Sequence, residues 1–243
     1  MTDINEIIIK PRPSLNQFID IHQGKDIYVI GSGNSCDYLS PSFFEGKITI
    51  GINHVYKKFN CNYYVRKESE MLDEILREIT DNSILFITEG KCGEIHNKIN
   101  LENINKHHNH TQNVVTCPHY ANCGPGQGYK NIKTSHFEKN KNTLISTSST
   151  ICTGIHLAYY MGAKNIILVG HDCCKLDGKS NFKNYHTEKT LKIAWKNQQQ
   201  YNNWLNGIEK QTIHVKQLLQ ELGTNIVSLN PFVSYNLEGH VKS

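Results

Sequence analysis

The sequence predicts an α/β fold, in which a Rossmann-like, mostly parallel sheet is flanked by helices. Short apolar runs, two of them followed directly by glycine, alternate with stretches of helical periodicity, as expected of a parallel sheet. The chain has 243 residues, which suits one large domain with a buried core. We therefore interpret residues 1–243 as a single domain.

In the first half of the chain, apolar runs of about five residues are interpreted as strands. The expected strands are 26–30, 47–52, 61–65 and 83–88. Apolar residues at helical spacing predict a helix over 70–79, and Pro41–Phe44 is expected to begin a short helix or a turn. Residues 90–142 show little periodicity and several glycines, so they are predicted to form an irregular insertion, as a lid over the site would.

In the second half, a buried helix is expected from about Ile151 and is closed by Gly162. Residues 165–170 are the clearest candidate for a central strand, because five successive positions are dominated by Ile, Leu and Val. A long helix over 191–222 and a last strand over 225–229 complete the alternation.

Composition excludes several classes of protein. The formal charge is +4 and the basic residues are dispersed, so no nucleic-acid partner is predicted and an anionic small substrate is favoured. The eight cysteines form no C-x-x-C pair. Neither an export signal nor a transmembrane run of about 20 apolar residues is visible. We expect a soluble, cytoplasmic protein with reduced thiols.

A glycine-containing loop directly follows the first expected strand. It comprises Gly31, Ser32, Gly33, Asn34 and Ser35. Ligands of parallel sheets collect at the carboxyl ends of strands, glycines allow close approach of a phosphate, and free amides donate to it. The loop therefore predicts nucleotide or phosphate binding, and an ordinary strand-to-helix turn is the alternative.

Two further segments are candidates for the same crevice. Asn53 follows the second strand, at about the distance at which a dinucleotide fold places its ribose-binding acidic residue, and an amide both donates and accepts. The alternative is a strand-end turn. Ser149 and Thr150 precede a helix, where they are expected to cap it or to contact an anionic group.

Two residues are candidates for proton transfer. Asp172 closes the central strand in Gly170–Asp172 and is interpreted either as a base or substrate-orienting group, or as a carboxylate that stabilises its turn. His186 opens the long helix and is the second candidate. His107, His108 and His110 could attract a metal, but no four-ligand spacing is present and no metal site is predicted.

Four segments together resemble the bacterial family 42 sialyltransferases. These segments are 30–35, 51–56, 149–154 and 163–172. They also resemble the wider group of Maf-type flagellin glycosyltransferases and pterin-diphosphokinase-like domains. The resemblance covers about two thirds of the chain and leaves out the N-terminal arm and residues 90–142.

The resemblance implies roles for individual residues. Gly31, Ser32 and Gly33 would hold the nucleotide phosphate, and Asn53 would bind the nucleoside. Ser149 and Thr150 would approach the base or donor sugar, and His186 would be the general base. The sialyltransferases have Asn at the position of Ser32, Tyr at that of Cys174 and a ligand-contacting Asn at that of Arg66. The resemblance therefore implies a shared fold and nucleotide site more strongly than it implies specificity for sialic acid.

The leading hypothesis is a glycosyltransferase-like enzyme that transfers a sugar from a nucleotide-activated donor, CMP-linked sugars included, to the hydroxyl of a glycan or other acceptor. It would need neither a metal nor a resident cofactor. Lys175, Lys179 or Arg66 would offset charge on the leaving phosphate. The alternatives are a magnesium-dependent diphosphotransferase on the same scaffold and a non-catalytic nucleotide- or glycan-binding protein. The sequence does not determine the donor, the acceptor or the oligomeric state, and a homo-oligomer is among the states left open.

Overall fold

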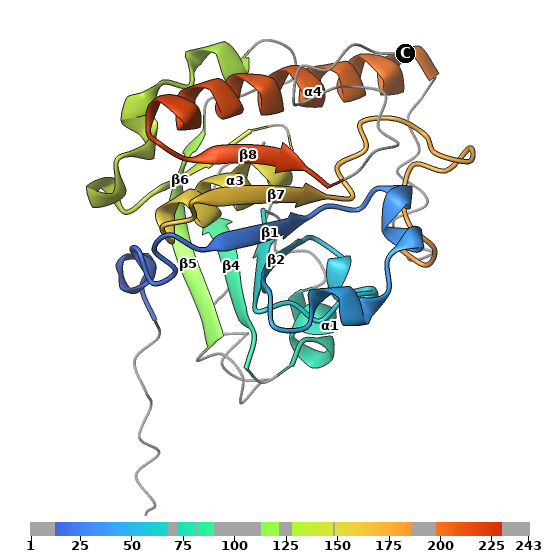
Figure 1. Ribbon diagram of the computed structural model, residues 1–243, viewed down its shortest axis with the longest axis horizontal. Helices are drawn as coiled ribbons and strands as arrows, with labels where there is room; N and C mark the ends of the chain where they lie inside the picture. Colours follow the sequence, from blue (N-terminus) through green and yellow to red (C-terminus); the bar gives the residue numbers. More distant parts are fainter. Residues whose placement is uncertain are drawn as a thin grey trace, which may run out of the picture.

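An eight-stranded sheet forms the centre of the computed structural model. The structure describes residues 13–67, 72–80, 82–89, 113–121, 128–147, 149–185 and 198–229. The strands are β1 (Asp26–Ile30), β2 (Ile48–Ile52), β3 (Tyr63–Arg66), β4 (Ile84–Glu89), β5 (Val114–Ala121), β6 (Leu144–Ser146), β7 (Asn165–Val169) and β8 (Asn225–Ser228). Their order across the sheet is β6-β5-β4-β3-β2-β1-β7-β8, and every neighbouring pair is parallel (Figure 1).

Helices cover both faces of this sheet. The three α-helices in the described part are α1 (Leu72–Glu78), α3 (Thr150–Tyr160) and α4 (Gln198–Glu221). Residues of α3 and α4 share one core cluster with the side chains of Ile27 and Val29 on β1. Ile75 and Leu76 of α1 belong to the cluster on the opposite face. Because both faces are covered, the strands are apolar almost throughout instead of alternating with polar residues.

Short 3₁₀ turns follow the strand ends and complete the two cores. They are η1 (Leu15–Phe18), η2 (Asn34–Tyr38), η3 (Pro41–Phe44), η4 (Val55–Lys57), η6 (Gly128–Asn131), η7 (Thr134–Phe137) and η8 (Lys139–Lys141). Phe18 of η1 packs edge-on against Phe86 of β4, with ring centroids 4.9 Å apart. Phe44 of η3 packs in the same way against Phe59 on the other face, at 5.0 Å.

The structure confirms the α/β fold, and the predicted strands, the helix over 70–79 and the helix from Ile151 lie within a few residues of observed elements. Of the long helix expected over 191–222, residues 191–197 lie outside the described part, and the rest is observed as α4. The expectation for 90–142 was wrong in part. Val114–Ala121 forms β5 and pairs with β4, and η6, η7 and η8 follow it, so this region contributes to the sheet and its flank. Its apolar run is short and interrupted by Thr116, which concealed a strand that has neighbours on both sides. Residues 90–112 and 122–127 lie outside the described part.

Two simpler expectations can be compared with the described residues. No helix in that part is long and apolar enough to cross a membrane. All six described cysteines are free thiols, as predicted: Cys36, Cys61, Cys117, Cys152, Cys173 and Cys174.

Candidate functional site at the carboxyl edge of the sheet

The order of the strands reverses between β1 and β7. From β1 the chain builds β2 to β6 on one side, whereas β7 and β8 lie on the other. The carboxyl ends of β1 and β7 therefore lead into loops that separate at this point, which is where open α/β sheets bind ligands. In Figure 1 the loop after β7 lies beside η2 at the tips of these strands.

The glycines of the two loops allow their backbones to touch. The Gly31 amide donates to the Val169 carbonyl and the Gly33 amide to the Gly170 carbonyl, both at 2.7 Å. A Cβ on Gly31 would lie 2.6 Å from the Gly170 oxygen, and one on Gly170 would lie 2.3 Å from the Cys36 sulfur. Gly170 also has a φ of +61°, which is unfavourable for other residues. Close packing of loop on loop therefore explains these glycines without a ligand.

Asp172 fixes the turn that follows the glycines. Its carboxylate accepts hydrogen bonds from the Ser35 amide at 2.9 Å and from the Ser35 hydroxyl at 2.5 Å. The residue is only 3% exposed, and a Cβ on Gly33 would lie 2.4 Å from the carboxylate. This geometry matches the turn-stabilising interpretation of Asp172. A role as a base or substrate-orienting group stays a prediction.

The contacts also change how the glycine loop could bind a phosphate. The amides of Gly31, Gly33 and Ser35 already donate to the last residue of β7 or to the loop that follows it. In the described part, the remaining amides of this loop, those of Ser32 and Asn34, donate to no other group. A phosphate at this loop would therefore be bound by two amides and not by a complete backbone cradle.

The segment after Asp172 packs onto the glycine loop through polar contacts. The Asn34 side-chain nitrogen donates to the Leu176 carbonyl at 2.9 Å. Asn181 donates to the Ser32 hydroxyl at 2.8 Å, and the Phe182 amide donates to the Ser32 carbonyl at 3.0 Å. Lys175 and Lys179, the candidates for charge compensation, are exposed residues of this segment. Cys174, at the position where the family 42 sialyltransferases have a Tyr, is partly exposed in the same segment.

Asn53 presents a buried acceptor at the same edge. Its φ is +54°, a left-handed conformation that Asn tolerates better than most residues. Its amide donates to the Val65 carbonyl at 3.0 Å, which fixes the residue between the ends of β2 and β3. Its side-chain oxygen Oδ1 is buried and has no hydrogen-bond partner among the described residues. The Oδ1 of Asn34, a residue that is 3% exposed, also has no hydrogen-bond partner in the part that the structure describes.

The N-terminus of α3 reaches this edge as well. Ser149 occupies the N-cap position, as predicted, but its hydroxyl makes no capping bond. Instead the Thr147 hydroxyl accepts from the Ser149 amide at 3.2 Å. One turn on, the Thr153 hydroxyl oxygen is fully buried and has no hydrogen-bond partner within the described ranges. The Ile151 side chain would lie 3.5 Å from a Cβ on Gly31, so the first turn of α3 adjoins the glycine loop.

Two basic residues lie beside the start of α3. Arg66 ends β3 and is 4% exposed. The Lys67 ammonium donates to the carbonyl of Thr147, two residues before the N-cap. The positive end of the helix dipole points to the same place. The carboxyl edge therefore holds two basic side chains, those of Arg66 and Lys67, beside the positive end of the α3 dipole.

A chain of aromatic and titratable side chains, which the sequence analysis missed, extends from Asn53 along the edge. His54 is buried, its Nδ1 lies 3.2 Å from the Tyr56 hydroxyl, and its ring packs on Tyr185. The Tyr56 hydroxyl donates to Glu74 at 3.0 Å, and Lys57 forms an ion pair with Glu74 at 3.1 Å. Burial and this hydrogen bond raise the pKa of Tyr56, so it remains a donor. The signal available in the sequence was the run His54–Tyr56 directly after a strand.

Some predicted site residues lie outside the described residues. They are His186, His107, His108 and His110. The structure thus brings together the glycine loop, Asn53, Ser149, Thr150, Asp172 and Arg66, and the position of His186 stays a prediction. Within the described ranges, no group of three His, Cys, Asp or Glu side chains could hold a metal ion.

Replacing Asp172 by alanine is expected to destabilise the protein by about 1–3 kcal/mol. The reason is that the Ser35 amide and hydroxyl, both buried with Asp172, would lose their acceptor. Urea unfolding at neutral pH would measure the change. Asp177→Ala is the matched control, because Asp177 is an exposed residue of the same segment that bonds only the exposed Tyr38. Equal stability of the two variants would show that the carboxylate is not needed for the turn.

No protein-family model matches this chain, and no curated protein matches it. Among solved structures, it is similar to the sialyltransferase CstII from Campylobacter jejuni, solved in complex with cytidine-5'-monophosphate: 14% identity over 86% of this chain and 81% of that chain, with a TM-score of 0.47. The monofunctional alpha-2,3-sialyltransferase Cst-I from the same organism is 13% identical over 92% of this chain and 79% of that chain, with a TM-score of 0.49. At this level the likeness concerns the path of the chain and not its reaction. It does not bear on the Maf-type or pterin-diphosphokinase-like part of the resemblance.

Proposed function

We propose that this protein is a glycosyltransferase-like enzyme that binds a nucleotide-activated sugar at the carboxyl edge of the sheet and transfers the sugar to an acceptor hydroxyl. One observation carries the proposal. Three buried side-chain oxygens at this edge have no hydrogen-bond partner in the described part of the chain, namely Oδ1 of Asn34, Oδ1 of Asn53 and Oγ1 of Thr153. Buried polar atoms are nearly always hydrogen-bonded, and each exception costs about 1–3 kcal/mol. A ligand that bonds them recovers that cost.

The chemistry of these groups fits the two halves of a nucleotide. The Asn34 and Asn53 oxygens are acceptors and require donors, which ribose hydroxyls or an exocyclic base amine supply. A phosphate requires donors and positive charge, which the start of α3, Arg66 and Lys67 supply. Neither a nucleoside alone nor a phosphate alone would bind both the buried acceptors and the basic groups.

The proposed reaction needs a base and a stabilised leaving group. The acceptor oxygen forms a bond to the anomeric carbon of the sugar while the bond from that carbon to the phosphate oxygen breaks, and its electron pair leaves with the nucleotide. The acceptor proton passes to His186. Arg66, Lys175 or Lys179 offsets the charge that develops on the phosphate. In this scheme the protein requires no metal and no resident cofactor, and the nucleotide sugar is a substrate.

Replacing Asn53 by glycine is expected to weaken nucleotide binding by about tenfold or more without loss of stability. Glycine adopts the left-handed conformation of Asn53 freely, and its lack of a side chain removes the buried unpartnered oxygen. The measurement is a thermal-shift and calorimetric screen of CMP, UDP, GDP and ATP, each with and without magnesium. Asn142→Gly is the matched control, because Asn142 has a φ of +49° and precedes β6 at the opposite edge.

The outcomes separate the alternatives. Nucleotide binding that Asn53→Gly leaves unchanged would contradict the assignment of this edge. Binding that depends on magnesium would favour the diphosphotransferase. Binding of a nucleotide sugar that is never turned over, with a range of hydroxyl acceptors, would favour a non-catalytic binding protein.

A further inference from the structure

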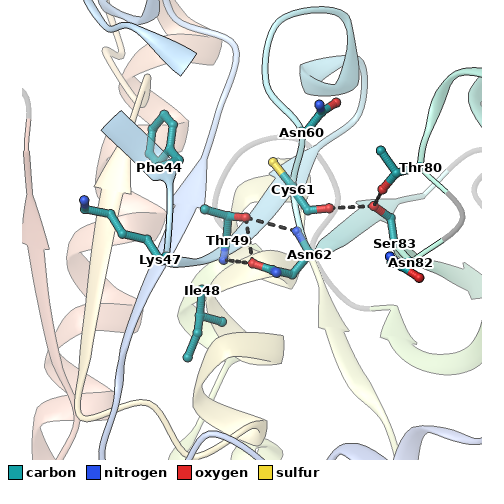
Figure 2. A pocket seen from close by; sticks show the side chains of 11 residues that line it. Phe44, Lys47, Ile48, Thr49, Asn60, Cys61, Asn62, Thr80, Asn82 and Ser83 are labelled. Atoms are coloured by element: carbon teal, nitrogen blue, oxygen red, sulfur yellow. Dashed lines mark hydrogen bonds between the residues drawn. The ribbon is translucent and has the colours of Figure 1, made fainter. Parts of the chain in front are cut away.

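A second hollow lies at the other edge of the sheet, away from the candidate site. It has a volume of about 400 Å³ and is lined by residues at or before the first residues of β2, β3 and β4 (Figure 2). In a parallel sheet the amino ends of strands face away from the carboxyl ends, so Asn53, Arg66 and the start of α3 do not take part in it. No residue proposed for nucleotide binding lines it.

One wall of this pocket is a fixed amide. The Asn62 Oδ1 accepts from the Thr49 amide at 2.8 Å and from the Thr49 hydroxyl at 3.0 Å, and the Thr49 hydroxyl accepts from the Asn62 amide at 3.0 Å. These three bonds, two of which Figure 2 shows meeting at the Asn62 side-chain oxygen, determine the orientation of that side chain. Its Nδ2 group, with two N–H donors, has no partner among the described residues and is preorganised for a ligand.

Hydroxyl groups adjoin this amide. The Ser83 hydroxyl donates to the Cys61 carbonyl at 2.7 Å and lies 2.7 Å from the Thr80 hydroxyl. The exposed side chains of Asn60 and Asn82 lie at the rim. Burial raises the pKa of the Cys61 thiol to about 12, so this thiol is neutral and not nucleophilic. This part of the lining therefore offers neutral groups that both donate and accept.

Among the described residues that line the pocket, Lys47 is the only one with a charged side chain. Lys47 lines the pocket, and its ammonium group lies at the periphery of the lining side chains, 4.6 Å from the centroid of the Phe43 ring (Figure 2). The described residues that line the pocket include no Asp or Glu. A carboxylate would be attracted to the charge of this ammonium group.

We propose that this pocket binds an acidic sugar, either a monosaccharide or the acidic end of a glycan. Sugar hydroxyls both donate and accept, and each Asn amide presents a donor beside an acceptor that can engage neighbouring hydroxyls. Lys47 would bind the carboxylate of the sugar. The volume is within the range of small-molecule sites. The inference rests on the pocket alone and does not depend on the proposed transferase activity.

The test uses three probes on the full chain: glucuronate, glucose and inorganic phosphate, measured by isothermal calorimetry and ligand-observed NMR. We expect glucuronate to bind more tightly than glucose or phosphate. Lys47→Met should weaken glucuronate binding by about tenfold and leave glucose binding unchanged. Asn82→Ala, which alters an exposed residue, should weaken binding of both sugars. Lys164→Met, an exposed lysine just before β7, is the matched control.

Three outcomes would overturn the proposal: no sugar binds, phosphate binds as tightly as glucuronate, or Lys47→Met has no more effect than Lys164→Met. The Asn53→Gly variant distinguishes this site from the nucleotide site. It should bind glucuronate as the unmodified protein does, and loss of that binding would place the sugar at the carboxyl edge and overturn the proposal. Failure of the nucleotide screen would leave the glucuronate result unaffected.

Discussion

His186→Ala is expected to lower turnover by about 10²–10⁴-fold while nucleotide affinity remains nearly unchanged. An acceptor hydroxyl is a poor nucleophile near neutral pH, so its attack benefits from a base whose pKa is close to 7. Unperturbed imidazole, at about 6.5, is the nearest match among side chains. His186 follows directly on Tyr185, whose ring packs against His54 beside Asn53. The chain therefore enters the His186 segment from the edge where the donor is proposed to bind.

The measurement is single-turnover and steady-state kinetics with the donor identified by the nucleotide screen. His136→Ala is the control, because His136 lies on η7, before β6, and its Nδ1 bonds the backbone of Lys133. Unchanged turnover in His186→Ala would remove this assignment. Asp172 would then be the next candidate, although its carboxylate already accepts two hydrogen bonds from Ser35.

The free energy of unfolding is expected to fall by about 4 kcal/mol between pH 7 and pH 5 because of two buried histidines. Burial lowers the pKa of His156 to about 3, with His136 and Lys139 adding repulsion, and burial lowers the pKa of His171 to about 4. Their pKa in the unfolded chain is about 6.5. Below that pH the unfolded state binds more protons than the folded state, so protonation favours unfolding. Each histidine accounts for about 2 kcal/mol of the loss.

Urea unfolding at pH 7 and pH 5 measures this effect. The contacts support the neutral forms: the His156 Nδ1 accepts from the Ile145 amide at 2.8 Å, and the His171 Nε2 lies 2.7 Å from the Thr212 hydroxyl. The variant His171→Gln should show about half the pH dependence of the unmodified protein. Asp37 and Glu74, whose pKa values are lowered by Lys58 and Lys57, contribute mainly below pH 5. Equal stability at the two pH values would contradict both histidine assignments.

The sequence was sufficient to predict most of the sheet, because strands buried on both faces are nearly continuous apolar runs. Ile27, Val29 and Ile30 of β1 are all completely buried, which is why the run was recognisable. The sequence was insufficient for β5, whose apolar run Val114–Cys117 is short and interrupted by Thr116, and for the three-residue β6. Apolar runs this short have no period that distinguishes them from a loop.

The candidate site was predictable in position but not in detail. The glycine loop and Asn53 were recognisable because each directly follows a strand. The hydrogen bonds between Asp172 and Ser35 could not be predicted, because the two residues are 137 positions apart in the sequence. Only the pairing of β1 with β7 brings them together. The pocket at the other edge was also hidden, because its lining is contributed by short segments before three different strands. The roles of Ser149 and Thr153 depend on how α3 packs, which no local pattern encodes.

The pairing of β1 with β7 also has a consequence for how the chain folds. β1 and β2 are close in sequence and can pair early, whereas Asp26 of β1 meets Asn165 of β7 only after most of the chain is available. Closing so long a loop is entropically costly and slows folding. During synthesis, the amides of Gly31 and Gly33 have no acceptor until β7 and Gly170 emerge. The nucleotide site would therefore be among the last parts of the molecule to form, and a chain that stalls before β7 would present an open sheet edge at β1.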